Sequence, residues 1–266
     1  MSPSLSPTVS AIVTGASSGL GREIARLLAA RGLHLVLVAR RTARLEELRA
    51  ELTDVAPCTI LTLDLCEPEA LGASLASLKG VPPVEVLVNN AGYGLYAPFL
   101  DVPPEETRRL MEIHYFAAAA AVRTLLPGML SRGRGHVINV ASISTKMGPW
   151  GHSGYTAAKS ALVALTQSLS AEYRSRGVNF SYVNPGIVQT EYFDHPSYAP
   201  LQGQVRRHGI AAAAAARQIV GLLDRPRIEL CIPRHYRVLD WIRAISPDLA
   251  HWLVTRESRP SVRRDA

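Results

Sequence analysis

The chain has 266 residues, of which 47% are hydrophobic and 19% are charged, a balance that is typical of globular proteins and excludes an intrinsically disordered chain. This length suffices for one α/β domain or two small domains. The formal net charge is +7, but the basic residues are spread along the chain without a nucleic-acid-binding motif, so we expect no nucleic-acid partner.

The N-terminal composition and the cysteines favour a cytoplasmic protein. Residues 1–8 are rich in Ser and Pro and lack the basic and apolar regions of a signal peptide, so a disordered N-terminal segment is expected there. No apolar run is expected to reach the roughly 20 residues of a membrane-spanning helix. Cys58, Cys66 and Cys231 form no Cys-x-x-Cys pair, which favours reduced, buried thiols and no metal site.

Strands and helices are predicted to alternate along the chain. The predicted strands are 10–14, 33–38, 58–63, 84–88, 137–141, 178–183 and 228–232, and the predicted helices follow the turn at 15–21 and lie at 42–52, 68–78, 104–130, 154–176 and 211–223. Repeated strand–helix–strand units imply parallel strands with right-handed crossovers. We therefore expect an α/β fold, a doubly wound parallel sheet of about seven strands, in one domain over residues 9–232, followed by a helical extension at 233–266.

A glycine-rich turn directly follows the first predicted strand. Its sequence is Thr14-Gly15-Ala16-Ser17-Ser18-Gly19-Leu20-Gly21. Glycines allow a tight turn and let backbone N–H groups approach a pyrophosphate at the N-terminus of the next helix. The G-x-x-x-G-x-G spacing alone is weak evidence, but its strand–turn–helix setting favours a dinucleotide site.

The end of the second predicted strand favours NADP(H) over NAD(H). Proteins that bind NAD place an acidic residue there for the ribose 2′-OH, whereas this chain has Arg40 and Arg41. Guanidinium groups match a 2′-phosphate well. The alternative is that both Arg side chains are merely solvated at the start of a helix. Polar or small residues also follow the third and fourth strands, namely Asp64-Leu65 and Asn89-Asn90-Ala91-Gly92.

Tyr155 and Lys159 are four residues apart at the start of a predicted helix and so share one face. A tyrosine hydroxyl titrates at about 10, too high for efficient proton transfer at neutral pH. We expect the Lys159 ammonium and a nicotinamide cation to lower the Tyr155 pKa. Ser142 follows the fifth strand and could donate a hydrogen bond to a substrate carbonyl. Such a Tyr–Lys pair alone is most often surface decoration, but the combination with Ser142 and the glycine-rich turn favours catalysis.

In these motifs the sequence resembles the short-chain dehydrogenase/reductase family, in its Rossmann-type branch of ordinary length. The resemblance covers residues 10–190, where the glycine-rich turn is followed by Asp64, Asn89-Asn90-Ala91-Gly92, Ser142, Tyr155-x-x-x-Lys159 and Pro185-Gly186-x-x-x-Thr190. It implies that Tyr155 protonates the carbonyl oxygen as the nicotinamide delivers hydride, that Lys159 also holds the nicotinamide ribose, and that Ser142 positions the carbonyl. It further implies a homodimer or homotetramer and a nicotinamide lined by Pro185, Gly186, Val188 and Thr190.

One position departs from the family pattern. Many members have an Asn in the long helix before the serine strand, where it supports a water-linked proton relay, and His114 stands in the matching place here. A histidine could hydrogen-bond a relay water, and its ordinary pKa of about 6.5 suits proton shuttling. Alternatively, His114 is a packed neutral side chain and the relay is altered or unnecessary. The sequence leaves both open.

Aromatic residues in three segments favour a bulky apolar ketone or alcohol as substrate. In the family, the segment after Thr190 forms a lid over the substrate, and the aromatic, turn-rich sequence at 191–210 is typical of a mobile lid. The residues concerned are Tyr192, Phe193, His195, Tyr198 and Leu201 in that segment, Met147, Pro149, Trp150 and His152 before Tyr155, and Tyr93 and Tyr96.

The extension at 233–266 contains apolar residues at helical spacing. Val238, Trp241 and Ile245 form one predicted stripe, Ser246-Pro247 predicts a helix start, and Leu249 and Trp252 form a second stripe. With the Arg residues between them, these helices could rest on a membrane surface. We favour packing on the chain itself or on a partner subunit, because amphipathic stripes are most often core faces.

Together these patterns predict an NADP(H)-dependent oxidoreductase, most simply a ketoreductase acting on a hydrophobic carbonyl compound. The alternative is a non-catalytic NADP(H)-binding sensor or scaffold on the same fold, since fold does not determine function. Ser142, Tyr155 and Lys159 argue against it, because a protein that only binds nucleotide has little need for all three.

Overall fold

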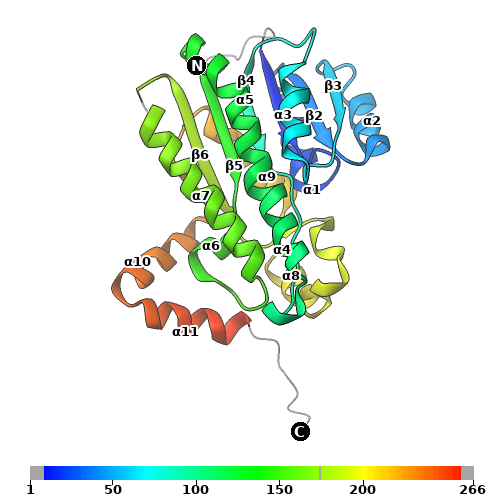
Figure 1. Ribbon diagram of the computed structural model, residues 1–266. Helices are drawn as coiled ribbons and strands as arrows, with labels where there is room; N and C mark the ends of the chain where they lie inside the picture. The colour runs from blue at the N-terminus through cyan, green and yellow to red at the C-terminus, as the bar shows by residue number, and fades with distance from the viewer. Residues whose placement is uncertain (1–8, 174, 259–266) are drawn as a thin grey trace.

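The computed structural model describes residues 9–173 and 175–258 of the chain (Figure 1). The segment 1–8, for which disorder was expected, and the part of the extension at 259–266 lie outside the described residues. Cys58, Cys66 and Cys231 are all free thiols.

A seven-stranded parallel sheet runs through the centre of the protein (Figure 1). Its strands are β1 (Ser10–Thr14), β2 (His34–Ala39), β3 (Cys58–Thr62), β4 (Val84–Asn89), β5 (Gly135–Val140), β6 (Val178–Pro185) and β9 (Glu229–Ile232). The order is β3-β2-β1-β4-β5-β6-β9, and every neighbouring pair is parallel. The expected doubly wound, Rossmann-type α/β fold is confirmed. The strand order reverses between β1 and β4, which is where ligands bind in such sheets.

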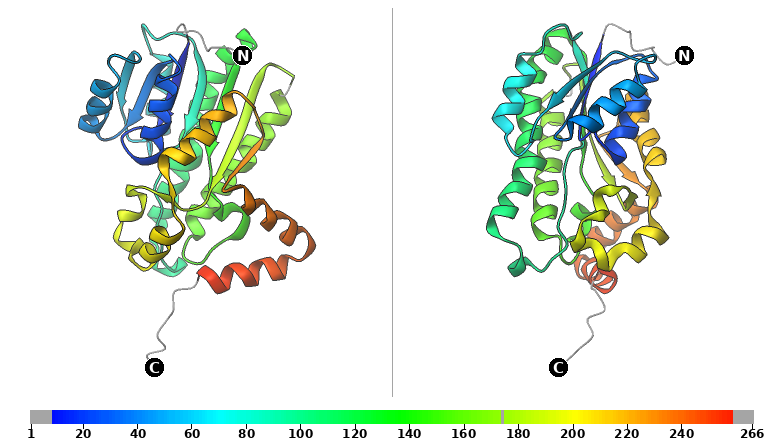
Figure 2. Two further views of the ribbon diagram at one scale, coloured as in Figure 1. Left: turned by 180° about the vertical axis from the view of Figure 1, so that it is seen from behind. Right: turned by 90° about the vertical axis from the view of Figure 1, so that its right-hand side faces the viewer.

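Helices cover both faces of this sheet (Figure 2). The α-helices are α1 (Gly19–Ala29), α2 (Thr42–Glu51), α3 (Pro68–Ala76), α4 (Pro104–Met111), α5 (Ala117–Arg132), α6 (Ser144–Met147), α7 (Ser153–Tyr173), α8 (Gln202–His208), α9 (Ala212–Val220), α10 (Val238–Ile245) and α11 (Pro247–Ser258). Buried residues of α1, α2 and α9 share one hydrophobic cluster, and those of α3 and α5 share the other.

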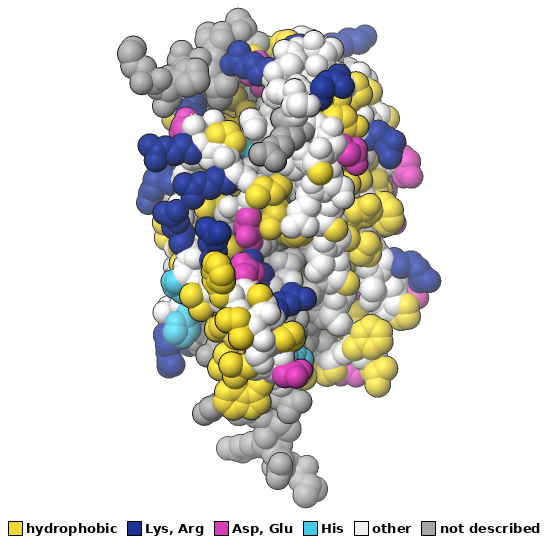
Figure 3. Space-filling view, turned by 90° about the vertical axis from the view of Figure 1, so that its left-hand side faces the viewer, with side chains coloured by type: hydrophobic (Ala, Val, Ile, Leu, Met, Phe, Trp, Pro, Cys, Tyr) yellow, Lys and Arg dark blue, Asp and Glu magenta, His cyan; other side chains and the backbone are white. Residues whose placement is uncertain are grey.

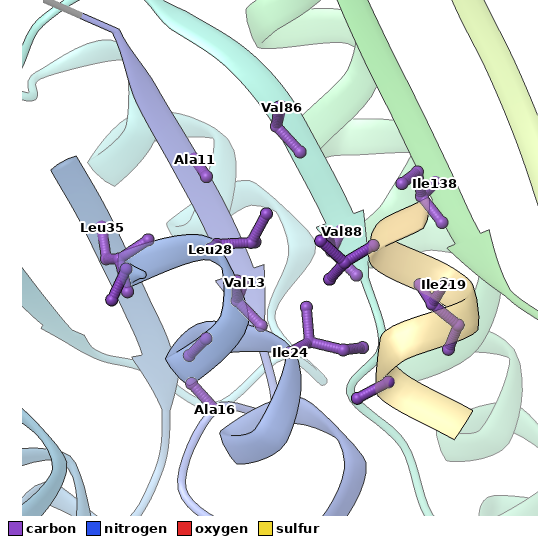
Figure 4. Packing of buried hydrophobic residues seen from close by; sticks show 14 of the residues in the cluster. Ala11, Val13, Ala16, Ile24, Leu28, Leu35, Val86, Val88, Ile138 and Ile219 are labelled. Carbon is purple, nitrogen blue, oxygen red and sulfur yellow. The ribbon is translucent and has the colours of Figure 1, made fainter. Parts of the chain in front are cut away.

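The first cluster explains why the central strands read as continuous apolar runs. Ile24 of α1 and Ile219 of α9 point toward Val13 of β1 and Val88 of β4 (Figure 4), and all four are at most 1% exposed. Burying one such side chain stabilises the fold by about 1.5–3 kcal/mol. Because the second cluster covers the opposite face with Ile12 of β1, the strands are buried on both sides.

The long predicted helix is interrupted by one π-helical turn, η2 (Glu112–Phe116), between α4 and α5. The whole stretch Pro104–Arg132 is 29 residues long with a mean hydropathy of 1.2 over its most apolar window, so by length and composition it could cross a membrane. The expectation that no segment would reach this length was wrong, because alanines at 117–121 raise the hydropathy. Here the stretch packs against α3 and the sheet with Ala121 and Met129 fully buried, which is typical of a core helix.

The chain between β6 and α9, which the sequence analysis predicts to be a lid, consists of short and irregular elements. These are the small parallel pair β7 (Val188–Gln189) and β8 (Ile210–Ala211), the 3-10 turns η3 (Glu191–Asp194) and η4 (Pro196–Leu201), and α8. Further 3-10 turns are η1 (Phe99–Asp101), η5 (Gly221–Leu223) and η6 (Arg234–Arg237). Because β7 pairs with β8, the start and the end of this segment lie side by side.

The C-terminal extension packs one side on the domain and exposes the other. Lys146 binds Asp240 of α10 at 2.5 Å, and Ala250 and Val254 of α11 are buried. The expected helix start is present, since the Ser246 hydroxyl accepts a hydrogen bond from the Leu249 amide at 3.3 Å. Hydrophobic side chains nevertheless gather on the surface at this end of the molecule (Figure 3), and the outward residues Trp241 and Ile245 are 70% and 84% exposed.

Candidate active site

The ends of β1 and β4 are joined by one hydroxyl group. Thr14 Oγ1 accepts hydrogen bonds from the backbone amides of Asn90 at 2.9 Å and Ala91 at 3.1 Å, and it donates to the Val88 carbonyl at 3.3 Å. The Asn90 side-chain amide donates in turn to the Thr14 carbonyl at 3.0 Å. These bonds hold the predicted Asn-Asn-Ala-Gly segment against the start of the glycine-rich turn.

The glycine-rich turn has the geometry of a nucleotide-binding turn. Gly15 has φ +69°, and its amide donates to the Val38 carbonyl at 2.8 Å, so the chain bends back toward β2 as soon as β1 ends. Ser17 and Ser18 form the bend, and Gly19, Leu20 and Gly21 are the first residues of α1. The N-terminus of this 11-residue helix therefore faces the carboxyl edge of the sheet, where it favours an anionic group.

The structure brings the Pro-Gly-x-x-x-Thr segment to the same edge. A Cβ on Gly19 would lie 2.9 Å from the Thr190 Cβ, so the two residues are in direct contact. Val188 is buried in the core, and the Gly186 amide bonds the Ile232 carbonyl at 2.7 Å. Tyr236, which the sequence analysis did not single out, packs over Gly186 from the C-terminal extension.

The two consecutive arginines have different surroundings. Arg40 lies 3.8 Å from the Asp64 carboxylate, whose other oxygen accepts the Cys66 amide at 3.0 Å, while the following Leu65 is buried. Arg41 turns toward the glycine-rich turn and bonds the hydroxyl of Ser18 at 2.6 Å. Of the two, Arg41 is the one that the fold brings to the turn.

Tyr155 is partly buried and lies among hydroxyl groups. Burial raises its pKa above the ordinary value of 10.0, while hydrogen bonds with Ser142 and Tyr192 act in the opposite direction. Among the chain's own groups, burial outweighs the hydroxyl bonds, so the Tyr155 pKa is raised here; the lowering expected with a nicotinamide cation nearby stays a prediction. Ser142 itself is placed by the Ser144 amide, which donates to its oxygen at 3.2 Å.

Lys159 lies under Tyr155 with its ammonium 5.8 Å from the centre of the tyrosine ring. The side chain is 4% exposed, and its Nζ donates to the Val140 carbonyl at 2.6 Å. Burial lowers the pKa of Lys159 to about 7. Its charge is therefore readily lost or gained near neutral pH, which suits a group that exchanges protons.

His114 lies in the π-helical turn η2, a feature that is frequent at functional sites. Its ring is 5.2 Å from the ring of Tyr155, and its Nε2 bonds the Tyr93 carbonyl at 2.7 Å. Burial, followed by the charge of Lys159, holds the pKa of His114 well below 6.5. Of the two alternatives that the sequence left open, this favours the packed neutral side chain, because a ring with so low a pKa is neutral at physiological pH.

The other nitrogen of this ring lacks a partner in the described chain, and the residue lines a small cavity. Nδ1 of His114 is buried and has no hydrogen-bond partner in the described chain. A neutral ring whose Nε2 donates to a carbonyl must accept at Nδ1. A cavity of about 10 Å³ is lined by His114, Lys159, Asn89 and Thr14, and this volume is at the lower limit for one water molecule. Packing of a neutral ring and binding of a relay water are thus compatible here.

Aromatic residues from all three predicted segments form one cluster over Tyr155, whereas Tyr93 donates its hydroxyl to Glu106 instead. Tyr192 lies 6.1 Å from the Tyr155 ring, and its hydroxyl is 3.1 Å from that of Tyr198. Tyr96 stacks on Tyr198 at 6.3 Å and meets Trp150 edge-on at 5.0 Å. Tyr198 is fully buried, so the segment after Thr190 packs closely over Tyr155 in this structure.

Two polar features escaped the sequence analysis. Asn89 donates to Asn139 at 2.8 Å, and Asn139 donates to Thr166 at 2.8 Å, which joins β4, β5 and α7 through the core. Glu191 binds Arg41, which follows β2, and Arg44 of α2. Its position directly after the Thr190 motif is the only sequence signal that could have indicated these ion pairs. In the part of the chain that the structure describes, no three His, Cys, Asp or Glu side chains come together as a metal site.

Comparison with known proteins agrees with this geometry. The family described as short chain dehydrogenase matches residues 9–197. The dehydrogenase/reductase SDR family member 7B of Bos taurus is 32% identical over 264 residues, covering 93% of this chain and 81% of that protein. A short-chain dehydrogenase from Sphingobium yanoikuyae in complex with NADPH has a TM-score of 0.78 and 26% identity, covering 98% of this chain and 99% of that one. An SDR from Burkholderia phymatum in complex with NAD has a TM-score of 0.82 over 91% and 94% of the chains, but at 24% identity it supports the fold alone.

The low pKa of Lys159 predicts a stability that rises with pH. The folded-state pKa of about 7 lies below the reference value of 10.5, so between these values the unfolded chain binds more protons and each pH unit adds up to about 1.4 kcal/mol to the free energy of unfolding. Between pH 7.5 and 8.5 the wild type should gain about 1 kcal/mol relative to Lys159→Met, since every other titrating group is the same in the two proteins. Urea unfolding at both pH values measures this, with the exposed Lys79→Met as control. Equal pH slopes in wild type and Lys159→Met would contradict the buried, weakly basic ammonium.

Proposed function

Because the chain belongs to the short-chain dehydrogenase family, it is an oxidoreductase, and we propose that it reduces a hydrophobic ketone with NADPH. The observation that carries the proposal is the meeting of Ser142, Tyr155 and Lys159 beside the glycine-rich turn, at the point where the strand order reverses. The preference for NADP(H) is supported by Arg41, whose guanidinium lies over the Ser17 and Ser18 hydroxyls. The NADPH complex of the Sphingobium yanoikuyae relative adds to it.

The residues present fit a dinucleotide. The positive end of α1 and the serines of the turn would hold the pyrophosphate, Arg41 the 2′-phosphate, and Thr190 the nicotinamide end. When bound, the cofactor supplies or accepts the hydride. The groups that would donate, accept or relay a proton, Tyr155, Lys159 and His114, are side chains of the protein.

The chain supplies the proton that completes the reduction. The Tyr155 hydroxyl, with its pKa raised by burial, is protonated at neutral pH and able to donate. Ser142 hydrogen-bonds the same region and would orient the substrate oxygen. Lys159, with a pKa of about 7, would return a proton toward Tyr155. His114 Nδ1 would accept a hydrogen bond from a water in the cavity that Lys159 also lines, and so position that water for the relay.

The substrate class follows from the surface over Tyr155. The rings of Tyr96, Trp150, Tyr192 and Tyr198 pack on one another above Tyr155 and are mostly buried, so a substrate would have to move some of them aside and would then lie against apolar rings. A hydrophobic ketone would displace the Tyr192 hydroxyl from Tyr155, and aromatic faces would stack on its apolar body. This favours bulky aromatic or alicyclic ketones over small anionic acids.

Replacing Tyr155 tests the proposed proton donor. Tyr155→Phe removes the hydroxyl and keeps the ring, so ketone-dependent NADPH oxidation should fall by about a hundredfold or more, while the Kd for NADPH changes little. Ser142→Ala should lower kcat as well, without loss of NADPH binding. The assay uses a panel of aliphatic, aromatic and steroid-like ketones. A Tyr155→Phe enzyme with unchanged kcat would refute the role of Tyr155.

Replacing His114 separates relay from packing. His114→Asn keeps a hydrogen-bonding side chain at the cavity and should retain kcat within about tenfold, whereas His114→Phe keeps the ring volume without an acceptor and should lose about ten- to a hundredfold. The diagnostic is the pH profile of kcat, which should shift only in His114→Phe, while both proteins bind NADPH as the wild type does. If both variants had the kcat and the pH profile of the wild type, His114 would have only a packing role.

A further inference from the structure

The carboxylate of Glu191 lies between two arginines that come from a distant part of the chain. Its Oε2 is 2.9 Å from Nη1 of Arg41, and its Oε1 is 2.7 Å from Nη1 of Arg44. Glu191 and Arg41 are 150 residues apart in sequence. The two bonds join η3, the first turn of the lid segment, to the first turn of α2.

The same arginine also binds the glycine-rich turn. Arg41 Nη2 donates to the Ser17 hydroxyl at 3.2 Å and to the Ser18 hydroxyl at 2.6 Å. Two guanidinium groups thus hold one anionic group near the end of β2, and one of these guanidinium groups also binds two serine hydroxyls of the glycine-rich turn. This donor set, in this place, is the one that a ribose 2′-phosphate would require. In the structure the anionic group is the chain's own carboxylate.

The residues on either side of Glu191 contact other parts of the predicted cofactor and substrate site. Thr190 packs on Gly19 at the start of α1, and Tyr192 hydrogen-bonds Tyr155. The segment 190–192 therefore lies across the pyrophosphate turn and the catalytic tyrosine. This placement is independent of the arginine contacts. It is consistent with a segment that has to move when the cofactor and the substrate bind.

We propose that Glu191 is a specificity-determining residue whose carboxylate competes with the 2′-phosphate of NADP(H) for Arg41 and Arg44. The inference rests on the proposed NADP(H) function. NADP(H) binds by exchanging the carboxylate for the phosphate, which releases the first turn of the lid segment. NAD(H) has no group that displaces Glu191, so with NAD(H) the contact between lid and arginines persists.

The strength of these ion pairs suits an exchangeable contact. The side chains of Glu191, Arg41 and Arg44 are 41%, 46% and 42% exposed, and ion pairs at such positions are individually weak and sensitive to salt. A phosphate carries about two negative charges and three acceptor oxygens, so it can replace a single carboxylate on the two guanidinium groups. The hydrogen bonds from both arginines lower the pKa of Glu191, which keeps the carboxylate charged at neutral pH.

The test compares two ligands that differ only in the 2′-phosphate. Adenosine 2′,5′-bisphosphate and adenosine 5′-monophosphate are titrated calorimetrically into wild type and Glu191→Gln, which has the same shape without the charge. Glu191→Gln should bind the bisphosphate about three- to tenfold more tightly at low salt, with the monophosphate within about twofold of wild type. The gain should shrink at an ionic strength of about 1 M, where screening is strong.

Two matched variants identify the cause of any change. Asp194→Asn removes an exposed acid from the same turn and should leave both affinities unchanged; an equal gain in Asp194→Asn would overturn the inference, since it would be a general charge effect. An unchanged or weaker affinity of Glu191→Gln for the bisphosphate would also overturn it. In that case the affinity of Arg41→Ala for the bisphosphate tests the proposed function separately. If Arg41→Ala binds the bisphosphate more weakly than wild type, Arg41 recognises the 2′-phosphate and only the role of Glu191 is refuted. If wild type and Arg41→Ala both bind the two ligands equally, the proposed NADP(H) preference itself fails.

Discussion

The hydrogen bonds of Thr14 set the geometry on which the site depends. One hydroxyl accepts two backbone amides from the segment after β4 and donates to the end of β4 itself, at the place where the strand order reverses. Buried hydrogen bonds of this kind are costly to lose, because each unpaired backbone amide would be left without a partner. The glycine-rich turn begins at this junction, and Thr14 itself lines the cavity that His114 and Lys159 share.

Burial determines the proton chemistry around that junction. Three titratable groups lie close together, and for each of them burial is the largest influence: it raises the pKa of Tyr155, lowers that of Lys159 to about 7 and keeps His114 neutral. In the function that we propose, the aromatic segment after Thr190 would favour a hydrophobic substrate and, by excluding water from Tyr155, would keep this tyrosine protonated until the substrate is bound.

The sequence was sufficient for features that depend on local pattern. The parallel sheet of seven strands and the glycine-rich turn after β1 follow from periodicity, motif spacing and family resemblance, whereas the order of the strands was not predicted. It was insufficient where two distant segments meet. The pairing of Glu191 with Arg41 joins residues 150 positions apart, and the neutral state of His114 depends on its burial in the folded chain and on the nearby charge of Lys159. The apolar length of 104–132 was missed because alanine is weakly hydrophobic and gives no apparent stripe.

The most direct measurement of the central claim is isotope transfer. NADPH carrying deuterium at C4 of the nicotinamide, on one face at a time, is incubated with the protein and a ketone from the hydrophobic class, and the alcohol is analysed by mass spectrometry. Our account predicts one deuterium at the carbinol carbon from one labelled face only, and none from the other. Alcohol without deuterium from either face, or no alcohol from any ketone despite NADPH binding, would contradict hydride transfer and leave a protein that binds the nucleotide without catalysis.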